Sequence, residues 1–407
     1  MPLSRRLFLN AFGLGANRRG LSATFVSARG REANEAKSGP GSLGQPLPAA
    51  SADSADIRID SNENPTGPGA AVMAALVGAF GGAGRYPTNS RPSTSDLRNA
   101  VARKLSVRPE NVVMGAGSRE LLRSAVRIFT SPTRHLITAA PSYEQPEKMA
   151  EQIGVPVRRV PVDKNGRLDL DKMAEAARWS GLVYICNPNN PTATVHPAKA
   201  VAEIASRLRK ESPETAILID EAYHDYVTDP GYATALPLAL EHPNVLVTRT
   251  LSKAYGMAGL RIGYAIGQVR TIEAMARWAM PYSQSTLGVA AAIAALADQA
   301  HIDAEQARNT EVRRFTTRFF KDAGLQAWDS QANFVFVEIK RPAKEFKEAC
   351  AKAKVLVGRP FPPLDQNHAR ISLGTMDEMK RATEVFSRVL GINQARVISG
   401  SGSIREK

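Results

Sequence analysis

Short, continuous apolar runs recur along most of the chain, and segments with apolar residues at helical spacing separate them. A short apolar run bounded by turn residues is typical of a buried strand. The runs are Val112–Met114, His135–Ala140, Val155–Val160, Leu182–Cys186, Ala216–Ile219 and Val245–Val247. Helical patterns cover 72–80, 97–105, 121–129, 269–278, 286–297, 303–322, 343–352 and 376–390. This alternation predicts an α/β fold, with a mostly parallel sheet wrapped by helices.

The order of these patterns predicts two lobes. Residues 93–297 hold most of the strand-like runs and form the predicted large domain. Residues 298–392 form a smaller α+β domain, which the segment 56–92 joins. A chain of 407 residues is long enough for two lobes with sizeable cores. The tail 393–407 is predicted to be disordered.

The first 55 residues do not follow this pattern. Ser4-Arg5-Arg6-Leu7-Phe8-Leu9 resembles a twin-arginine export signal, and Gly39–Ala52 has the Gly, Pro, Ser and Ala content of a flexible linker. The leader therefore predicts export to the periplasm or the exterior by a twin-arginine route. The alternatives are an organellar transit peptide and a basic disordered arm on a cytoplasmic protein.

Composition narrows the classes of partner. The formal net charge of +14 makes nucleic acid binding an alternative to weigh, but basic residues are dispersed among acids and no nucleic-acid motif occurs. Two cysteines and six scattered histidines form neither a disulfide framework nor a metal-ligand pattern. The apolar stretch 286–297 is too short to cross a bilayer. We therefore predict no nucleic acid, no metal and no membrane span.

The most informative stretch is 250–264, which follows the predicted strand Val245–Val247. Lys253 lies between Ser252 and small residues, and Arg261 follows eight positions later. Most lysines simply face solvent. However, ligands of open α/β sheets bind at strand ends, and hydroxyls beside a fixed cation suit a phosphate. A lysine in this setting suggests a Schiff-base nucleophile for pyridoxal phosphate.

Two further motifs fit the same cofactor. Residues 115–120 join a predicted strand to a helix, whose N-terminus offers free N–H groups to an anion. Asp220 ends the buried run Ala216–Ile219, and a carboxylate that faces the pyridine nitrogen keeps this nitrogen protonated. A helix cap is the alternative role for this acid.

The stretch 250–264 resembles the lysine motif of fold-type-I pyridoxal-phosphate aminotransferases of class I and II, most closely the histidinol-phosphate aminotransferases. Asn62–Pro68, Arg85–Pro87 and Asn187–Thr192 match further motifs of this family in the family's order. The resemblance covers residues 57–390. It implies a fold-type-I aminotransferase fold, pyridoxal 5'-phosphate as cofactor and a homodimer with composite sites.

The resemblance also implies cofactor roles for matching residues. Lys253, Asp220 and Tyr143 are the predicted catalytic residues: the Schiff-base lysine, the partner of the ring nitrogen and the ring that stacks on the cofactor. Asn190 and Tyr223 bind the cofactor O3′. The phosphate is bound by Ala116, Gly117, Ser118, Thr250, Ser252 and Arg261, with Tyr86 reaching over from the neighbouring subunit.

Three positions depart from the family pattern. Ala116 stands in the glycine turn where the family often has an asparagine. Arg119 replaces an acidic residue after the glycine turn, and we expect it to face solvent. Ala193 stands where the family has a glycine. This replacement needs only slight local adjustment unless its φ is positive.

The substrate pocket is implied by four residues, namely Asn62, Asn333, Arg359 and Arg370. A guanidinium suits carboxylate and phosphate equally, so the predicted substrates are an anionic amine and a 2-oxo acid such as 2-oxoglutarate. The amine is histidinol phosphate or an amino acid. The alternatives are an aromatic amino acid aminotransferase, a decarboxylase of the same fold and, more distantly, a non-catalytic binding protein.

Overall fold

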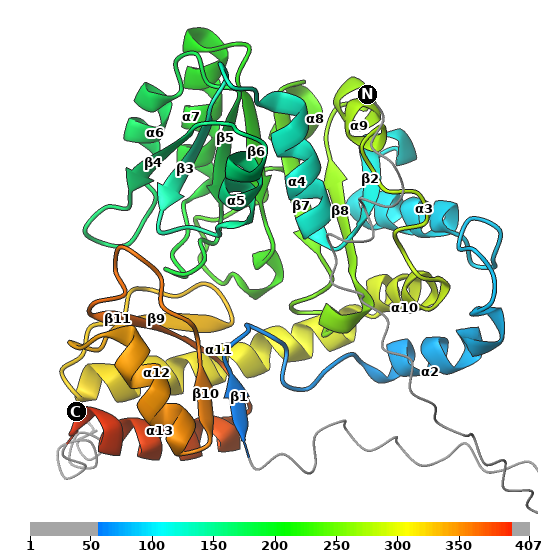
Figure 1. Ribbon diagram of the computed structural model, residues 1–407. Coiled ribbons are helices and arrows are strands. Elements are labelled where there is room, and N and C mark those ends of the chain that lie inside the picture. The colour runs from blue at the N-terminus through cyan, green and yellow to red at the C-terminus, as the bar shows by residue number, and fades with distance from the viewer. Residues whose placement is uncertain (1–55, 393–407) are drawn as a thin grey trace, which may run out of the picture. The chain divides into compact units, whose positions relative to one another are not determined.

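The computed structural model describes residues 56–392 (Figure 1). Its centre is a seven-stranded sheet with the strand order β2-β8-β7-β6-β5-β3-β4. The strands are β2 (Val112–Ala116), β3 (Leu136–Ala140), β4 (Val157–Pro161), β5 (Leu182–Cys186), β6 (Ala216–Asp220), β7 (Val245–Thr250) and β8 (Ile262–Ile266). Only β8 runs antiparallel to its neighbours. The mostly parallel sheet predicted from the apolar runs is thereby confirmed.

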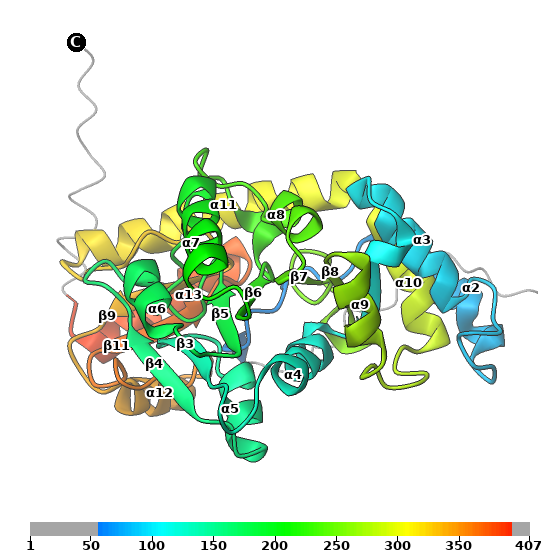
Figure 2. The same ribbon diagram turned by 90° about the horizontal axis from the view of Figure 1, so that it is seen from above.

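Helices cover both faces of this sheet. One face packs against α4 (Ser118–Phe129), α5 (Gln145–Gln152) and α9 (Val269–Ala276), as Figure 2 shows. The other face packs on a larger apolar core. The helices that contribute to this core include α3 (Thr94–Leu105), α6 (Leu170–Ala176), α7 (Ala198–Glu211), α8 (Leu236–Glu241) and α10 (Thr286–Ala297). Strands buried on both faces have near-continuous apolar sequences, as in β5 and β6.

A second apolar core belongs to the C-terminal part of the chain. It is built on β9 (Phe334–Glu338), β10 (Val355–Val357), β11 (His368–Ser372), α12 (Ala343–Lys352) and α13 (Met376–Leu390). The helix α11 (Gln299–Asp322) contributes Ile302 to the larger core and Phe320 to this second core. It therefore connects the two cores.

Residues 56–92 divide between the two cores. The strand β1 (Ile57–Ile59) pairs in parallel with β10, so it belongs to the second core. The helix α2 (Ala70–Ala79) instead packs on α10, and its Val72 belongs to the larger core. The segment that connects them, 60–69, therefore runs from one core to the other.

Helix boundaries follow local capping chemistry. The helix α3 begins after Ser93, whose hydroxyl accepts from the N–H of Asp96 while the Asp96 carboxylate accepts from the N–H of Ser93. Thr94 and Ser95 could also cap a helix, but only Ser93 is followed by an acid at the third helical position. None of the helices within 56–392 is long and apolar enough to cross a membrane. The predictions for 1–55 and 393–407 lie outside the described residues.

Candidate active site

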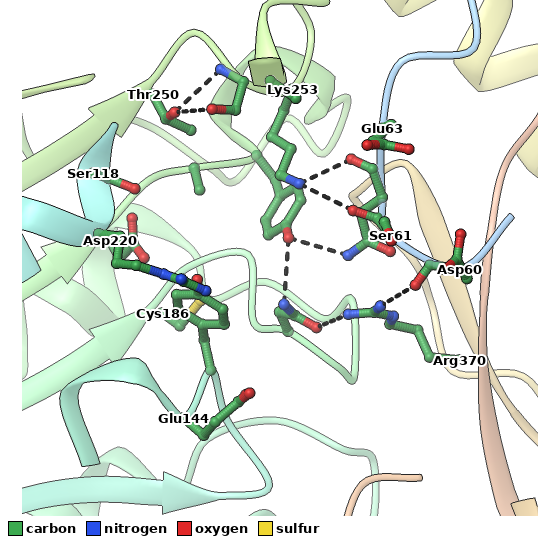
Figure 3. Close-up of a pocket in the computed structure, with 18 of the residues that line it drawn as sticks. Asp60, Ser61, Glu63, Ser118, Glu144, Cys186, Asp220, Thr250, Lys253 and Arg370 are labelled. Atoms are coloured by element: carbon green, nitrogen blue, oxygen red, sulfur yellow. Dashed lines mark hydrogen bonds between the residues drawn. The ribbon is translucent and has the colours of Figure 1, made fainter. Parts of the chain in front are cut away.

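A cavity of about 550 Å³ opens where β5, β6 and β7 end, beside the N-terminus of α4 (Figure 3). The connecting segment 60–69 and residues of the second core close its other side. The following predicted site residues line it: Asn62, Ser118, Tyr143, Asn190, Asp220, Tyr223, Thr250, Ser252, Lys253, Arg261, Arg359 and Arg370. Residues far apart in the sequence thus meet, because parallel strands end at one edge of the sheet.

Lys253 lies on the loop that follows β7 and extends its amine toward the connecting segment. The amine donates hydrogen bonds to the backbone oxygens of Ser61, at 3.3 Å, and Asn62, at 3.0 Å. Burial and, secondarily, the charge of Arg370 lower the pKa of Lys253 to about 8. About a tenth of this amine is therefore neutral at pH 7, and nucleophilic attack requires this neutral form.

Asp220 is the last residue of β6, and both carboxylate oxygens accept hydrogen bonds from adjacent strands. The Tyr184 hydroxyl on β5 donates to Oδ2 at 3.0 Å, and the Thr248 hydroxyl on β7 donates to Oδ1 at 3.1 Å. Burial raises the pKa of Asp220 to about 6, although these donors oppose the shift. No lysine or arginine forms a salt bridge with Asp220 in the described part of the chain. The site therefore holds a buried acid in need of a cationic partner.

Tyr223 and Asn190 form a hydrogen-bonded group with two other side chains. The Tyr223 hydroxyl accepts from Nδ2 of Asn62 at 3.1 Å and from Nδ2 of Asn190 at 3.4 Å. Nη1 of Arg370 donates to Oδ1 of Asn190 at 2.8 Å. Because the hydroxyl oxygen already accepts twice, its own proton is available to a group in the cavity.

The end of the cavity near α4 has the features of an anion site. The N-terminus of α4 follows Gly117, which has a positive φ of 72°. Nη1 of Arg261 lies 3.3 Å from the Ser252 hydroxyl, and Thr250 donates to the same hydroxyl at 2.8 Å. Free helical N–H groups, two hydroxyls and a guanidinium together suit a phosphate.

The opposite end carries two guanidinium groups beside one aromatic ring. The carbon Cζ of Arg359 lies 4.0 Å from the ring centroid of Phe361, and Cζ of Arg370 lies 4.8 Å from it. Nη2 of Arg370 also donates to the Asp60 backbone oxygen at 2.6 Å, and burial lowers the pKa of Arg370 to about 10. Arg370 is thus held rigidly, whereas Arg359 is partly exposed.

Comparison with known proteins agrees with this geometry. Residues 55–386 match the family described as aminotransferase class I and II. The chain belongs to this family. It is 37% identical to a histidinol-phosphate aminotransferase of Limosilactobacillus fermentum, over 70% of this chain and 79% of that protein. The corresponding protein of Bacillus subtilis is 33% identical, over 82% of this chain and 91% of that protein.

A solved structure of a related enzyme contains the cofactor. The histidinol-phosphate aminotransferase of Sinorhizobium meliloti, in complex with pyridoxal-5'-phosphate, superposes with a TM-score of 0.76 and 30% identity. The alignment covers 82% of this chain and 91% of that one. The predicted fold, enzyme class and cofactor are therefore confirmed: the protein is an aminotransferase that uses pyridoxal 5'-phosphate.

Apart from these comparisons, the chemistry of the side chains that line the cavity also suits the cofactor. One cavity contains an amine with a lowered pKa, a buried acid without a cationic partner and an anion site. Pyridoxal phosphate presents an aldehyde, a basic ring nitrogen and a phosphate, which are the complements of these three features. The fit depends on Lys253, Asp220 and the α4 end of the cavity being present together.

Four predicted residues do not line the cavity. Ala116 donates its N–H to Oε2 of Glu120 at 2.6 Å, so this N–H is not free for a phosphate. Gly117 shapes the turn without lining the cavity. Asn333 is fully buried, and its Nδ2 donates to the Asn62 backbone oxygen at 3.1 Å, so it supports the connecting segment. Tyr86 is 65% exposed and stacks on Tyr282, with ring centroids 4.6 Å apart.

Several residues that shape the site were not predicted from the sequence. Arg119, which we expected to face solvent, lines the cavity together with Glu144 and Lys347. Tyr184 supports Asp220 from within an apolar run, where a tyrosine resembles ordinary core. Ala193 has a positive φ of 63°, so the missing glycine does leave a strained backbone there.

We predict that Gly117→Ala weakens cofactor binding about tenfold or more. A Cβ at this position would lie 2.2 Å from Nη2 of Arg261, so the guanidinium must leave the anion site. Gly154→Ala is the matched control, because Gly154 has nearly the same φ, 73°, but open space around its Cβ. Spectroscopic titration with pyridoxal phosphate measures both dissociation constants. Equal values for Gly117→Ala and the wild type would contradict the assignment.

Proposed function

We propose that the protein transfers an amino group between an anionic amine and a 2-oxo acid such as 2-oxoglutarate, with Lys253 and Asp220 as the central catalytic residues. The observation that carries this proposal is their position on one cavity between an anion site and a pair of arginines. When bound, the cofactor supplies an electron sink for the substrate Cα. The remaining work falls to side chains of the protein.

Lys253 is the residue that would hold the cofactor covalently through its side-chain amine. Once released, this amine would take the proton from the substrate Cα as a base. As an acid it would then give this proton to C4′ of the cofactor. A pKa of about 8 suits both directions near neutral pH, because acid–base catalysis is most effective when the pKa lies close to the working pH. Burial beside Arg370 thus prepares Lys253 for this task.

Asp220, Tyr143, Asn190 and Tyr223 would orient the cofactor and hold its protons. The Asp220 carboxylate would keep a proton on the ring nitrogen, and the Tyr143 ring would stack on the cofactor and exclude water. Tyr223 would donate its free proton to O3′ beside Asn190. Ser118, Thr250, Ser252 and Arg261 would bind the phosphate, and Ala116 and Gly117 would act indirectly by shaping the turn.

The proposed amine carries its anion toward Arg359 and Arg370, beside Asn62. Histidinol phosphate is one donor to test, because the named relatives are histidinol-phosphate aminotransferases. Amino acids, including aromatic ones, are the second group. Purified holoenzyme should convert 2-oxoglutarate to glutamate with at least one of these donors. No glutamate with any donor, or release of carbon dioxide instead, would contradict transamination.

We also propose a homodimer in which Tyr86 completes the neighbouring site. Phe80, Tyr86, Trp278, Met280 and Tyr282 are all exposed, although such large apolar groups are usually covered in a stable assembly. They lie around α2 and the loop between α9 and α10, where Tyr86 and Tyr282 are in contact.

The dimer proposal predicts twice the chain mass of 43.9 kDa in sedimentation equilibrium. If Tyr86 donates to the partner's cofactor phosphate, Tyr86→Phe should lower cofactor affinity several-fold, because one charge-assisted hydrogen bond is lost. The mass should not change. A monomer, or unchanged affinity in Tyr86→Phe, would count against the composite site.

Export by the twin-arginine route remains a proposal that rests on Arg5 and Arg6. Cell fractionation tests it: the wild type should appear outside the cytoplasm, and Arg5→Lys with Arg6→Lys should retain the protein inside. Cytoplasmic wild type would refute it.

A further inference from the structure

The carboxylate of Glu144 lies at the arginine end of the active-site cavity, where the sequence predicted only cations. Glu144 directly follows Tyr143 and precedes α5. Its Oε2 lies 2.5 Å from Nη2 of Arg359, and its Oε1 lies 3.3 Å from Nζ of Lys148 on the outer side. Figure 3 shows Glu144 and Arg370 among the residues around the cavity.

This ion pair changes the charge that the cavity offers to a substrate anion. Arg359 and Arg370 share the ring of Phe361, so an anion that contacts both guanidinium groups also lies close to Glu144. The positive charge of Arg359 is already balanced by this carboxylate. Besides Lys253, Arg261 and Asp220 on the cofactor side, the lining holds the carboxyl groups of Asp60 and Glu63 and the cations of Lys347 and Arg119.

A single unbalanced guanidinium therefore dominates the binding of the substrate anion. Arg370 has both Nη atoms engaged by Asn190 and the Asp60 backbone, while its buried Nε has no partner within the described residues. The single charge of this fixed cation matches the single charge of a carboxylate. Arg119, Lys347, Arg359 and Arg370 outnumber Asp60, Glu63 and Glu144 in the lining by one positive charge. A phosphate monoester carries about −1.5 to −2 charges at pH 7, so its additional charge exceeds this surplus and is repelled by Glu144.

We propose that Glu144 makes this site selective for amines that carry a single negative charge, a carboxylate, over amines that carry a phosphate monoester. The proposal rests on the proposed transamination and narrows its substrate to an amino acid. The repulsion between an added charge and a carboxylate a few ångströms away, in a partly buried site, corresponds to about a tenfold to hundredfold discrimination.

Three amines that share one imidazole side chain test this selectivity. L-Histidine carries a carboxylate, histidinol phosphate carries a phosphate monoester, and histidinol carries neither. In the wild type we expect kcat/KM to be at least about tenfold higher for L-histidine than for histidinol phosphate. In Glu144→Gln, which keeps the shape and removes the charge, this ratio should fall at least about tenfold. Histidinol should respond little.

Glu147→Gln is the matched control. Glu147 lies on α5, which Glu144 directly precedes, and forms a salt bridge with Arg159, at 2.6 Å, but it does not line the cavity. The ratio of kcat/KM for L-histidine to kcat/KM for histidinol phosphate should be the same in Glu147→Gln as in the wild type. An equal ratio in Glu144→Gln and the wild type would overturn the proposal, as would a wild-type preference for histidinol phosphate.

A binding measurement separates this proposal from the proposed reaction. Inorganic phosphate and acetate are titrated into the holoenzyme, and the cofactor spectrum reports binding. Glu144→Gln should tighten phosphate binding at least about tenfold more than acetate binding. If no amine reacts with either enzyme, the proposed transamination fails, while this titration still supports or overturns the role of Glu144. Unchanged relative affinities for the two anions overturn it.

Discussion

Replacing Lys253 with alanine is expected to abolish measurable transamination. The loss of the acid–base function alone should cost about 10²–10⁴-fold in kcat, and the loss of the covalent attachment adds to this. Steady-state glutamate formation with the best amine donor measures the effect. The fold should be unaffected, because within residues 56–392 the Lys253 amine hydrogen-bonds only to the two backbone oxygens of Ser61 and Asn62.

Rescue by a small amine distinguishes a chemical role of Lys253 from a structural one. A small primary amine in the buffer can replace the missing proton carrier, so Lys253→Ala should regain part of its rate in proportion to the amine concentration. Lys253→Arg keeps a cation but offers no neutral amine, and it should be equally inactive without this rescue. Activity of Lys253→Ala within tenfold of the wild type would refute the assigned role.

Lys253 and Asp220 were predictable because the sheet determines where they lie. Each follows a continuous apolar run, and the carboxyl ends of neighbouring parallel strands meet at one edge. The pairing of Ile219 with Val247 and of Asp220 with Thr248 brings the two strand ends into register. Local sequence thus carried the information for the cofactor side of the cavity.

The substrate side was harder to predict because it depends on contacts between distant elements. Glu144 precedes α5 and Arg359 follows β10, and no local pattern indicates that their side chains pair. The role of Tyr184 could not be predicted for a different reason. A single tyrosine in a central strand fits the apolar pattern of a buried strand. Its hydrogen bond to Asp220 becomes evident only when β5 and β6 are paired.

Backbone conformation was the third feature that could not be predicted from the sequence. Whether Ala193 is strained depends on its φ, which the residue type does not determine. The observed value of 63° belongs to the left-handed region, where a residue with a Cβ costs about 1–2 kcal/mol. The loop that contains Asn190 therefore folds against a local preference, which the surrounding fully buried packing must offset.

Asp220→Asn is expected to lower activity and raise the stability of the cofactor-free protein. An amide cannot keep a proton on the ring nitrogen, so we expect kcat to fall about 10²–10³-fold or more, the usual cost of removing one buried electrostatic group. The stability effect has the opposite sign. Burial raises the pKa of Asp220 from 3.8 to about 6, which means that folding disfavours its ionised form.

The magnitude and pH dependence of this effect follow from linkage. Above pH 6 the ionised carboxylate costs the folded state about 3 kcal/mol, at 1.36 kcal/mol per pKa unit. The amide loses one hydrogen bond, from Tyr184 or Thr248, at about 1 kcal/mol. We therefore expect Asp220→Asn to be more stable by about 2 kcal/mol at pH 7. Below pH 3.8 the aspartic acid is protonated in both states, so the cost of about 3 kcal/mol falls away. The lost hydrogen bond then leaves Asp220→Asn less stable by about 1 kcal/mol.

Urea unfolding of both cofactor-free proteins across this pH range measures the difference. The advantage of Asp220→Asn should grow between pH 3.8 and about 6 and then remain constant. Thr248→Val is the control, since it removes a donor to Asp220 but keeps the carboxylate. It should lower stability most where Asp220 is ionised. If the stability difference for Asp220→Asn did not vary with pH, burial would not raise the pKa of Asp220. The assignment of this carboxylate as the partner of the ring nitrogen would then be unsupported.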